Sequence, residues 1–196
     1  MDLVDLITEK RFLGQEFLTW LWYKSEERGG AVAVPGRGDV SVTFEKHMLL
    51  EYGEGQEQEK VICRGLQTEL KEARAGLSLA KKPEQARLKL EWHEQEFGVT
   101  LTAATFEFRN VRLPKIVDRA DEGRGPEDLE ARVLERLALF ELLSDLVLGL
   151  FRLFIGIRIS RDWPRELLQI RAWIQESSQR LDRKSTRLNS SHGRRS

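Results

Sequence analysis

The 196-residue sequence contains a single cysteine, Cys63, and only three histidines. One cysteine cannot form an intrachain disulfide, and Cys63, His47 and His93 are too scattered along the sequence for a zinc site. The sequence also lacks a GxSxG nucleophile elbow, a Walker A sequence and a GxGxxG loop. We therefore expect a protein without catalytic residues, without a metal and without a cofactor.

A long uninterrupted hydrophobic run is also missing. The most apolar stretch, residues 139–159, contains two acidic and two basic residues, and this favours a buried core helix over a membrane span. No charged-then-apolar leader precedes the first predicted helix. Together with the cysteine content, these features predict a cytoplasmic protein that does not bind membranes.

Charge of one sign is not in excess, because 32 Lys and Arg balance 32 Asp and Glu. Residues 182–196 nevertheless hold five Lys and Arg against one Asp, which leaves the rest of the chain with 27 basic and 31 acidic residues, a net charge of −4. The polar composition of this tail predicts disorder. Its DRKSTRLNSSH sequence resembles the translated read-through of a common sequencing adapter. We interpret 1–181 as one domain and 182–196 as an artefactual tail without function.

Hydrophobic periodicity predicts an α+β fold, with an antiparallel sheet of about five or six strands covered by three or four helices. The expected helices are 4–27, 65–80, a long helix from Pro126 and a last helix from Asp162 to about Glu176. The expected strands are 39–45, 47–52, 60–64, a hairpin over 86–101 and 105–113, and residues 28–39 are expected to form a loop.

Side-chain spacing assigns faces to two of these elements. The inner stripe of the long helix is predicted to be Leu129, Val133, Leu137, Phe140, Ser144, Val147 and Phe151. In the hairpin, Leu88, Leu90 and Trp92 are predicted to face the core, with Arg87, Lys89, Glu91 and His93 on the opposite face.

The first helix carries eight large apolar residues within positions 12–23, spread around most of its circumference. Such a helix needs cover on two sides. We expect Phe17, Leu21, Leu13 and Trp20 to pack on the sheet, and Leu18 and Trp22 to form an interface with a missing domain or another subunit. The alternative is that the long C-terminal helices cover both sides.

The helix predicted over 65–80 has a second stripe beside its apolar one. Gln67, Lys71 and Arg74 share one side, Arg64 lies at its start, where free N–H groups favour an anion, and Lys81 and Lys82 follow its end. These residues could follow a phosphate backbone without reading bases. The alternative is an ordinary solvated face of mixed charge.

The segments VICRGLQTELKEARAGLSLAKKPEQARLKLEWHEQEFGVTLTAATFEFRNVRLP and LERLALFELLSDLVLGL resemble the C-terminal half of the RdgC family of recombination-associated proteins. The shared features are VI before a basic turn, the Gln of GLQ and the acidic-Trp pair of LKLEW, and FLGQEFLTWLW is similar to divergent bacterial members. The resemblance covers residues 10 to 160. The N-terminal portion of the family is missing here.

This resemblance implies a nucleoid-associated, non-catalytic protein that binds duplex DNA with little sequence preference and restrains RecA-driven strand exchange. It also implies a ring-shaped homodimer whose positively charged channel is lined by the strand–turn–helix, which by position selects Arg64 and Gln67. A rival interpretation is a protein–protein interaction or regulatory module that docks through its aromatic N-terminal helix and does not bind DNA.

Overall fold

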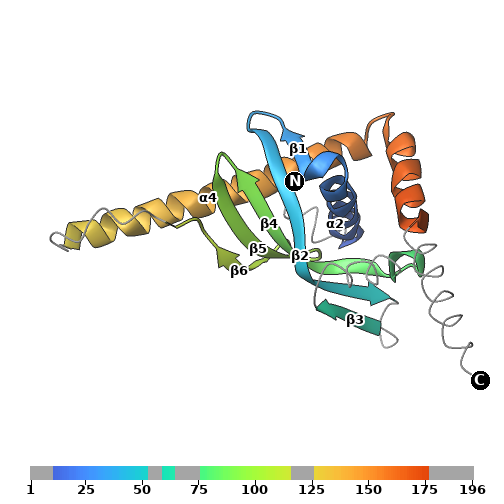
Figure 1. Cartoon of the computed structure of the whole chain (residues 1–196), viewed down its shortest axis with the longest axis horizontal. Helices are drawn as coiled ribbons and strands as arrows, with labels where there is room; N and C mark the ends of the chain where they lie inside the picture. The colour runs from blue at the N-terminus through green and yellow to red at the C-terminus, as the bar shows by residue number, and fades with distance from the viewer. Residues whose placement is uncertain (1–10, 53–58, 65–75, 116–125, 177–196) are drawn as a thin grey trace, which may run out of the picture.

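The computed structural model describes residues 11–52, 59–64, 76–115 and 126–176 (Figure 1). Within these ranges, six strands form one antiparallel sheet in the order β1-β2-β4-β5-β6, and β3 also pairs with β2. The strands are β1 (Ala31–Val34), β2 (Gly38–Tyr52), β3 (Glu59–Arg64), β4 (Lys82–Trp92), β5 (Gln95–Thr102) and β6 (Phe108–Arg112). Helices α2 (Arg11–Glu26) and α4 (Pro126–Arg158) and helical residues 163–176 accompany the sheet, which confirms the predicted α+β fold.

The predicted loop over 28–39 contains a strand. Residues 31–34 form β1, with Val32 and Val34 buried, and a turn at Pro35–Arg37 joins β1 to β2. Gly36 and Gly38 adopt positive φ angles of 76° and 78° in this turn. The alternating Ala–Val pattern is only four residues long. Because glycines surround it, the sequence pattern favoured a loop over a strand.

Two predicted strands, 39–45 and 47–52, are a single 15-residue strand, β2. Its pairing with β4 shifts register between Phe44 and Met48, so the alternation of faces is interrupted there without ending the strand. β4 begins at Lys82, four residues earlier than predicted, and pairs with β2 as far as Glu51. The longer pairing allows β2 to hold β1 and β3 on one side and β4 on the other.

Helix α2 is the centre of the core. Its contacts with β2 and β4 cover one side, and aromatic residues of α4 and of 163–176 cover the other (Figure 1). Phe17 lies 5.3 Å from Phe151 and 5.7 Å from Phe154 between ring centroids. Trp20 also contacts Phe154, so these two residues pack against α4 and not only against the sheet.

The prediction that Leu18 and Trp22 form an external interface is wrong. Leu18 is 0% exposed and Trp22 is 1% exposed within the chain itself. The Trp22 ring stacks on Phe44 of β2 at 5.8 Å and meets Trp173 edge-on at 5.5 Å. The sheet and the C-terminal helices together bury α2, because residues 163–176 fold back over the side that the sheet leaves open.

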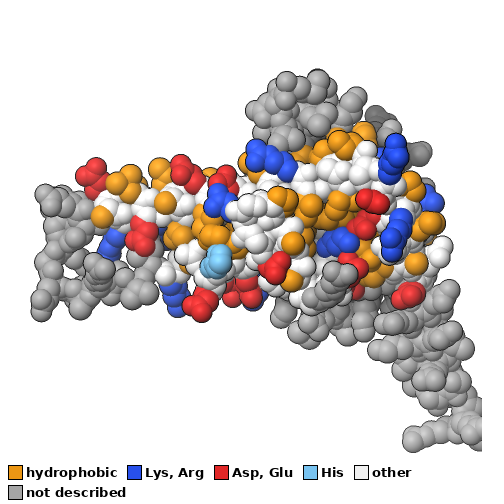
Figure 2. Space-filling view, turned by 90° about the horizontal axis from the view of Figure 1, so that it is seen from above, with side chains coloured by type: hydrophobic (Ala, Val, Ile, Leu, Met, Phe, Trp, Pro, Cys, Tyr) orange, Lys and Arg blue, Asp and Glu red, His pale blue; other side chains and the backbone are white. Residues whose placement is uncertain are grey.

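The predicted inner stripe of α4 is correct only at its C-terminal end. Val147 and Phe151 are buried, but the N-terminal half of the helix extends beyond the sheet as an arm (Figure 1). Apolar side chains remain exposed along this arm, where Figure 2 shows them interleaved with charged residues: Leu129, Val133, Leu134, Leu137 and Phe140. Periodicity identified the stripe, but the helix is longer than the sheet that it packs against.

Candidate nucleic-acid interface

The structure describes three of the six predicted DNA contacts. Arg64 ends β3, where its backbone pairs opposite His47 of β2. Lys81 precedes β4 and is half-buried, whereas Lys82 opens β4, is exposed and pairs opposite Glu51. The other three predicted contacts lie outside the described residues: Gln67, Lys71 and Arg74.

The two ends of the predicted basic segment lie close together. Both β3 and β4 run antiparallel to β2 and flank it on opposite sides. Arg64 and Lys82 pair with β2 residues four positions apart, which places their backbones roughly 16 Å from each other, given the usual strand rise and spacing. Residues 65–81 connect these two strands along the chain, and the structure describes 76–81 of this connection.

The C-terminal end of this connection lies on the core side of the sheet. Residues 76–78 are helical, in agreement with the prediction, and Leu77 is buried. A Cβ added to Gly76 would lie 2.8 Å from the Leu50 side chain and 3.7 Å from the Lys81 side chain. Lys81 therefore extends along this contact, on the same side of the sheet as the core residue Leu50.

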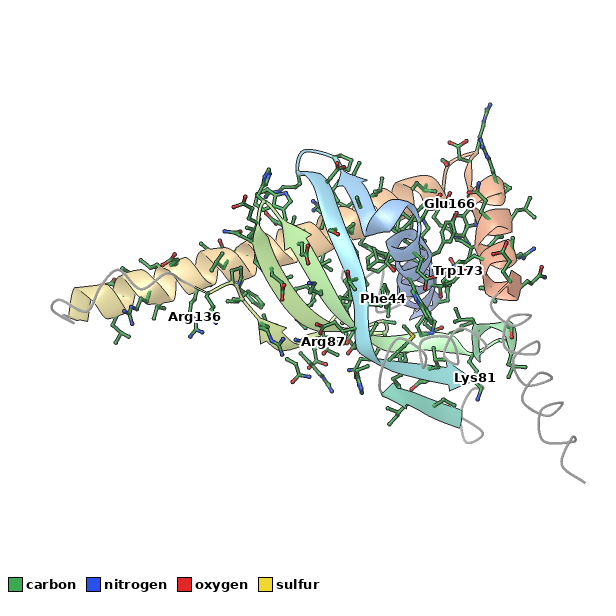
Figure 3. The ribbon with its side chains drawn as sticks, viewed as in Figure 1. Phe44, Lys81, Arg87, Arg136, Glu166 and Trp173 are labelled. Carbon is green, nitrogen blue, oxygen red and sulfur yellow. The ribbon has the colours of Figure 1, made fainter. Side chains whose placement is uncertain are left out.

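A second group of cations lies on the sheet face opposite the core. Cross-strand pairing aligns Arg87 with Thr100 and Arg109, and Lys89 with Gly98 and Arg112. Figure 3 shows Arg87 at the lower part of the sheet, away from α2. The predicted outward side of the hairpin contained Arg87 and Lys89, but nothing in its pattern indicated that β6 would add Arg109 and Arg112 beside them.

Carboxylates accompany most of these cations. Arg87 Nε donates to Glu45 at 3.0 Å, and Arg109 Nη2 donates to Glu107 at 2.7 Å. Lys89 lies 2.6 Å from Glu91 and 3.2 Å from Glu96. Hydrogen bonds to Glu91 and then to Glu96 raise the pKa of Lys89, so its charge is balanced locally.

Arg112 differs from these three cations. It is exposed and has no hydrogen bond or ion pair with any residue that the structure describes. Among the described residues of this sheet face, Arg87, Lys89 and Arg109 each have a carboxylate partner and Arg112 has none.

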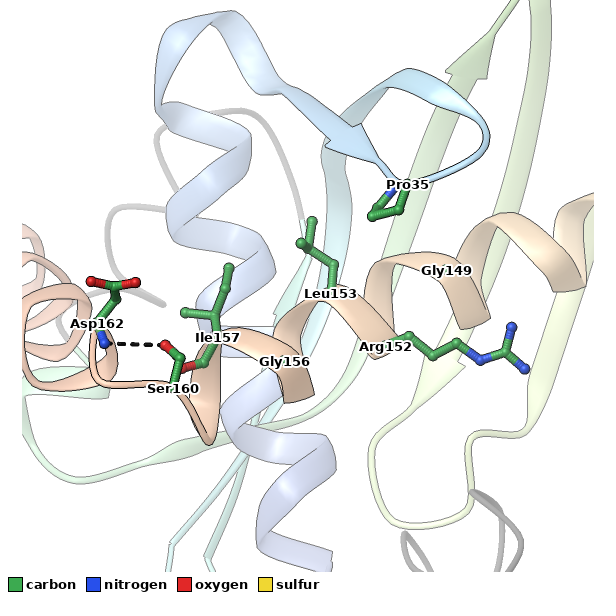
Figure 4. Close-up of a pocket in the computed structure, with 8 residues that line it drawn as sticks. All are labelled: Pro35, Gly149, Arg152, Leu153, Gly156, Ile157, Ser160 and Asp162. Atoms are coloured by element: carbon green, nitrogen blue, oxygen red, sulfur yellow. Dashed lines mark hydrogen bonds between the residues drawn. The ribbon is translucent and has the colours of Figure 1, made fainter.

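Two clefts are not lined by any of these four cations. One, of about 430 Å³, lies over the outer side of α4 between Pro35 and Asp162, with Gly149 and Gly156 on its floor (Figure 4). The other, of about 480 Å³, adjoins the β4–β5 turn and is lined by acidic residues that would repel a phosphate: Asp39, Glu91, Glu94 and Glu96.

Within the described ranges, no three metal-ligating side chains gather, and no helix there is long and apolar enough to cross a bilayer. No protein-family model, curated protein or solved structure matches the chain.

Proposed function

We propose that the chain is a non-catalytic module that binds duplex DNA through the phosphate backbone, with little dependence on base sequence. The proposed contacts lie between the end of β3 and the start of β4 along the chain: Arg64, Gln67, Lys71, Arg74, Lys81 and Lys82. Backbone neutralisation requires cations that follow the strand, and it needs no base-reading side chains.

The distribution of charge along the chain carries this proposal. Residues 60–82 hold six Lys and Arg against two Glu, a net charge of +4 in a body whose net charge is −4. The pairing of β3 and β4 with β2 places the two ends of this segment on the two strands that flank β2. A cationic stretch of sequence on an otherwise acidic body can bind a polyanion locally, while the rest of the protein repels it.

The double variant Lys71→Glu with Arg74→Glu tests the assignment. We expect it to abolish the electrophoretic shift of unrelated duplexes, because it converts two proposed phosphate contacts into repulsive ones. The matched control is Arg165→Glu with Arg171→Glu, which makes the same change in net charge at exposed positions of the 163–176 helix. Equal binding by the first variant and the parent would contradict the assignment.

The tail needs its own control, because the five Lys and Arg of residues 182–196 would attract DNA through charge alone. All proteins compared should carry Gln at the five tail positions that are now Lys or Arg. A shift that disappears with these tail substitutions alone would show that the body of the protein does not bind DNA.

The biological setting proposed here comes from the RdgC resemblance. In this setting, a homodimer associated with the nucleoid occupies duplex DNA and so restrains RecA-dependent recombination, with a further N-terminal domain completing the ring. Strand-exchange assays with and without the Lys71→Glu, Arg74→Glu variant test it: the parent should slow exchange and the variant should not. Inhibition by both proteins would contradict restraint through DNA occupation.

The rival interpretation, docking through the aromatic N-terminal helix, loses its proposed surface. Leu18 and Trp22 are buried inside the chain and are not available to a partner. Nothing in the described part of the chain favours this second function through α2.

A further inference from the structure

Gly98 of β5 is buried beneath the Arg87 guanidinium, and the base of the Arg112 side chain lies beside it. A Cβ added at this position would lie 2.8 Å from Arg87 Nη2 and 3.2 Å from Arg112 Cβ. The distance to Arg87 Nη2 is shorter than the contact distances that Cβ atoms make in proteins. A side chain at position 98 would therefore have to displace the Arg87 guanidinium. Glycine at position 98 therefore leaves room for the side chain of Arg87 to cross β5.

Three of the five N–H groups of Arg87 have partners that fix the guanidinium in place. Nε donates to Glu45, and Nη1 donates to the Asn110 carbonyl and, at 3.5 Å, to Thr100 Oγ1. Nη2 has no partner among the described residues, and it is not a buried unsatisfied atom. Arg87 thus presents one preorganised edge with two unused donors beside Gly98.

An irregularity in β6 brings Arg112 to this edge. Thr100 pairs with Arg109 and Gly98 pairs with Arg112, so β6 has one extra residue between its two arginines. Asn110, in this bulge, has a positive φ of 50° and supplies the carbonyl that holds Arg87. The bulge places both β6 arginines opposite outward-facing positions of β5.

We propose that the outer edge of the Arg87 guanidinium, which covers Gly98, forms an oxyanion site with the neighbouring exposed Arg112, and that the two side chains bind a phosphate group. Glu45 compensates Arg87, whereas Arg112 has no carboxylate partner among the residues that the structure describes, so the pair should attract one anion. The source of the phosphate is the backbone of the duplex DNA, and this step rests on the proposed function. The site would add a contact on the face opposite Lys81.

Replacement of Arg112 by Gln tests the site without disturbing the fold, because Arg112 is exposed and has no described partner. We expect duplex affinity to fall about tenfold, the usual effect of one lost charge-assisted hydrogen bond, and the salt dependence to weaken by about one phosphate contact. Arg171→Gln, at an exposed position of the 163–176 helix, is the matched control and should bind as the parent does. Gly98→Ala should reproduce the loss by displacing Arg87.

A titration with inorganic phosphate, followed at the backbone amides of Gly98 and Arg112, separates the two sources of phosphate. Shifts with duplex that disappear in Arg112→Gln support the site on DNA. If the amide signals shift with inorganic phosphate but not with duplex, the assignment of the site to DNA is overturned. If the parent binds duplex and Arg112→Gln binds it equally well, the site is refuted while the proposed function stands. If the parent does not bind duplex, the proposed function fails and this inference fails with it.

Discussion

Trp22 of α2 and Trp173 of the C-terminal helical segment meet edge-on, and both indole N–H groups donate to the carboxylate of Glu26 at 3.1 Å. One carboxylate thus joins the two tryptophans across the interface between α2 and residues 163–176. Trp20 makes a similar link, because its indole donates to Glu166 at 3.0 Å. These bonds fix the segment that closes the core over the second side of α2.

Removal of Trp173 should therefore destabilise the whole protein. We expect Trp173→Ala to lower the free energy of unfolding by about 2 kcal/mol, less than for a fully buried tryptophan because Trp173 is only partly buried. Arg171→Ala on the same helix is exposed and should change it by less than about 0.5 kcal/mol. Urea denaturation of both variants measures the difference, and equal stabilities would contradict the closing role of this segment.

The burial of Leu18 predicts a loss of stability without a loss of association. We expect Leu18→Ala to lower the free energy of unfolding by about 3 kcal/mol, since the side chain is 0% exposed. Sedimentation of the folded variant should match that of the parent. A variant of unchanged stability that sediments as a smaller species would restore the interface prediction.

Two glycines in helices should respond to alanine in opposite ways. A Cβ on Gly14 would lie 1.9 Å from the Ala103 carbonyl oxygen, whereas a Cβ on Gly156 would meet nothing within 4 Å. Gly14→Ala should therefore destabilise the protein by about 2 kcal/mol through overpacking. Gly156→Ala should stabilise it by up to about 1 kcal/mol through helix propensity. Thermal unfolding of the two variants measures both shifts, and a Gly14→Ala variant at least as stable as the parent would contradict the close approach of α2 to Ala103.

Alkaline pH should weaken the fold at the same interface. Burial lowers the pKa of Lys24, but hydrogen bonds to Glu166 and Glu27 outweigh it and raise the pKa above its ordinary value of 10.5. A raised folded-state pKa stabilises the protein below the unfolded-state pKa, and this contribution is lost as pH rises through the folded-state value. Burial also raises the pKa of Tyr23. The ionisation of Tyr23 at alkaline pH therefore also lowers the free energy of unfolding.

Denaturant unfolding at about pH 9 and about pH 11 measures this alkaline loss. Lys24→Met should show a smaller loss between these pH values than the parent, because it keeps only the contribution of Tyr23 and of other groups. An equal loss in parent and variant would contradict the role of the Lys24 ion pairs.

The sequence predicted the sheet well because alternation in β4 and β5 is regular and uninterrupted. It missed β1, whose four residues are surrounded by glycines, and it divided β2 where a register shift interrupts the alternation. Leu18 and Trp22 were assigned to the wrong surroundings because an apolar helix does not reveal which element covers it. The position of Arg112 beside Arg87 depends on the β6 bulge, and no periodic pattern encodes such a bulge.

The most direct test of phosphate-backbone binding is the affinity for unrelated duplexes at about 50 mM and about 200 mM salt, measured with the tail cations replaced by Gln. Five cationic contacts predict a loss of several hundredfold between these conditions, equal for every duplex sequence. An affinity that is insensitive to salt, or that differs widely between sequences, would contradict the account.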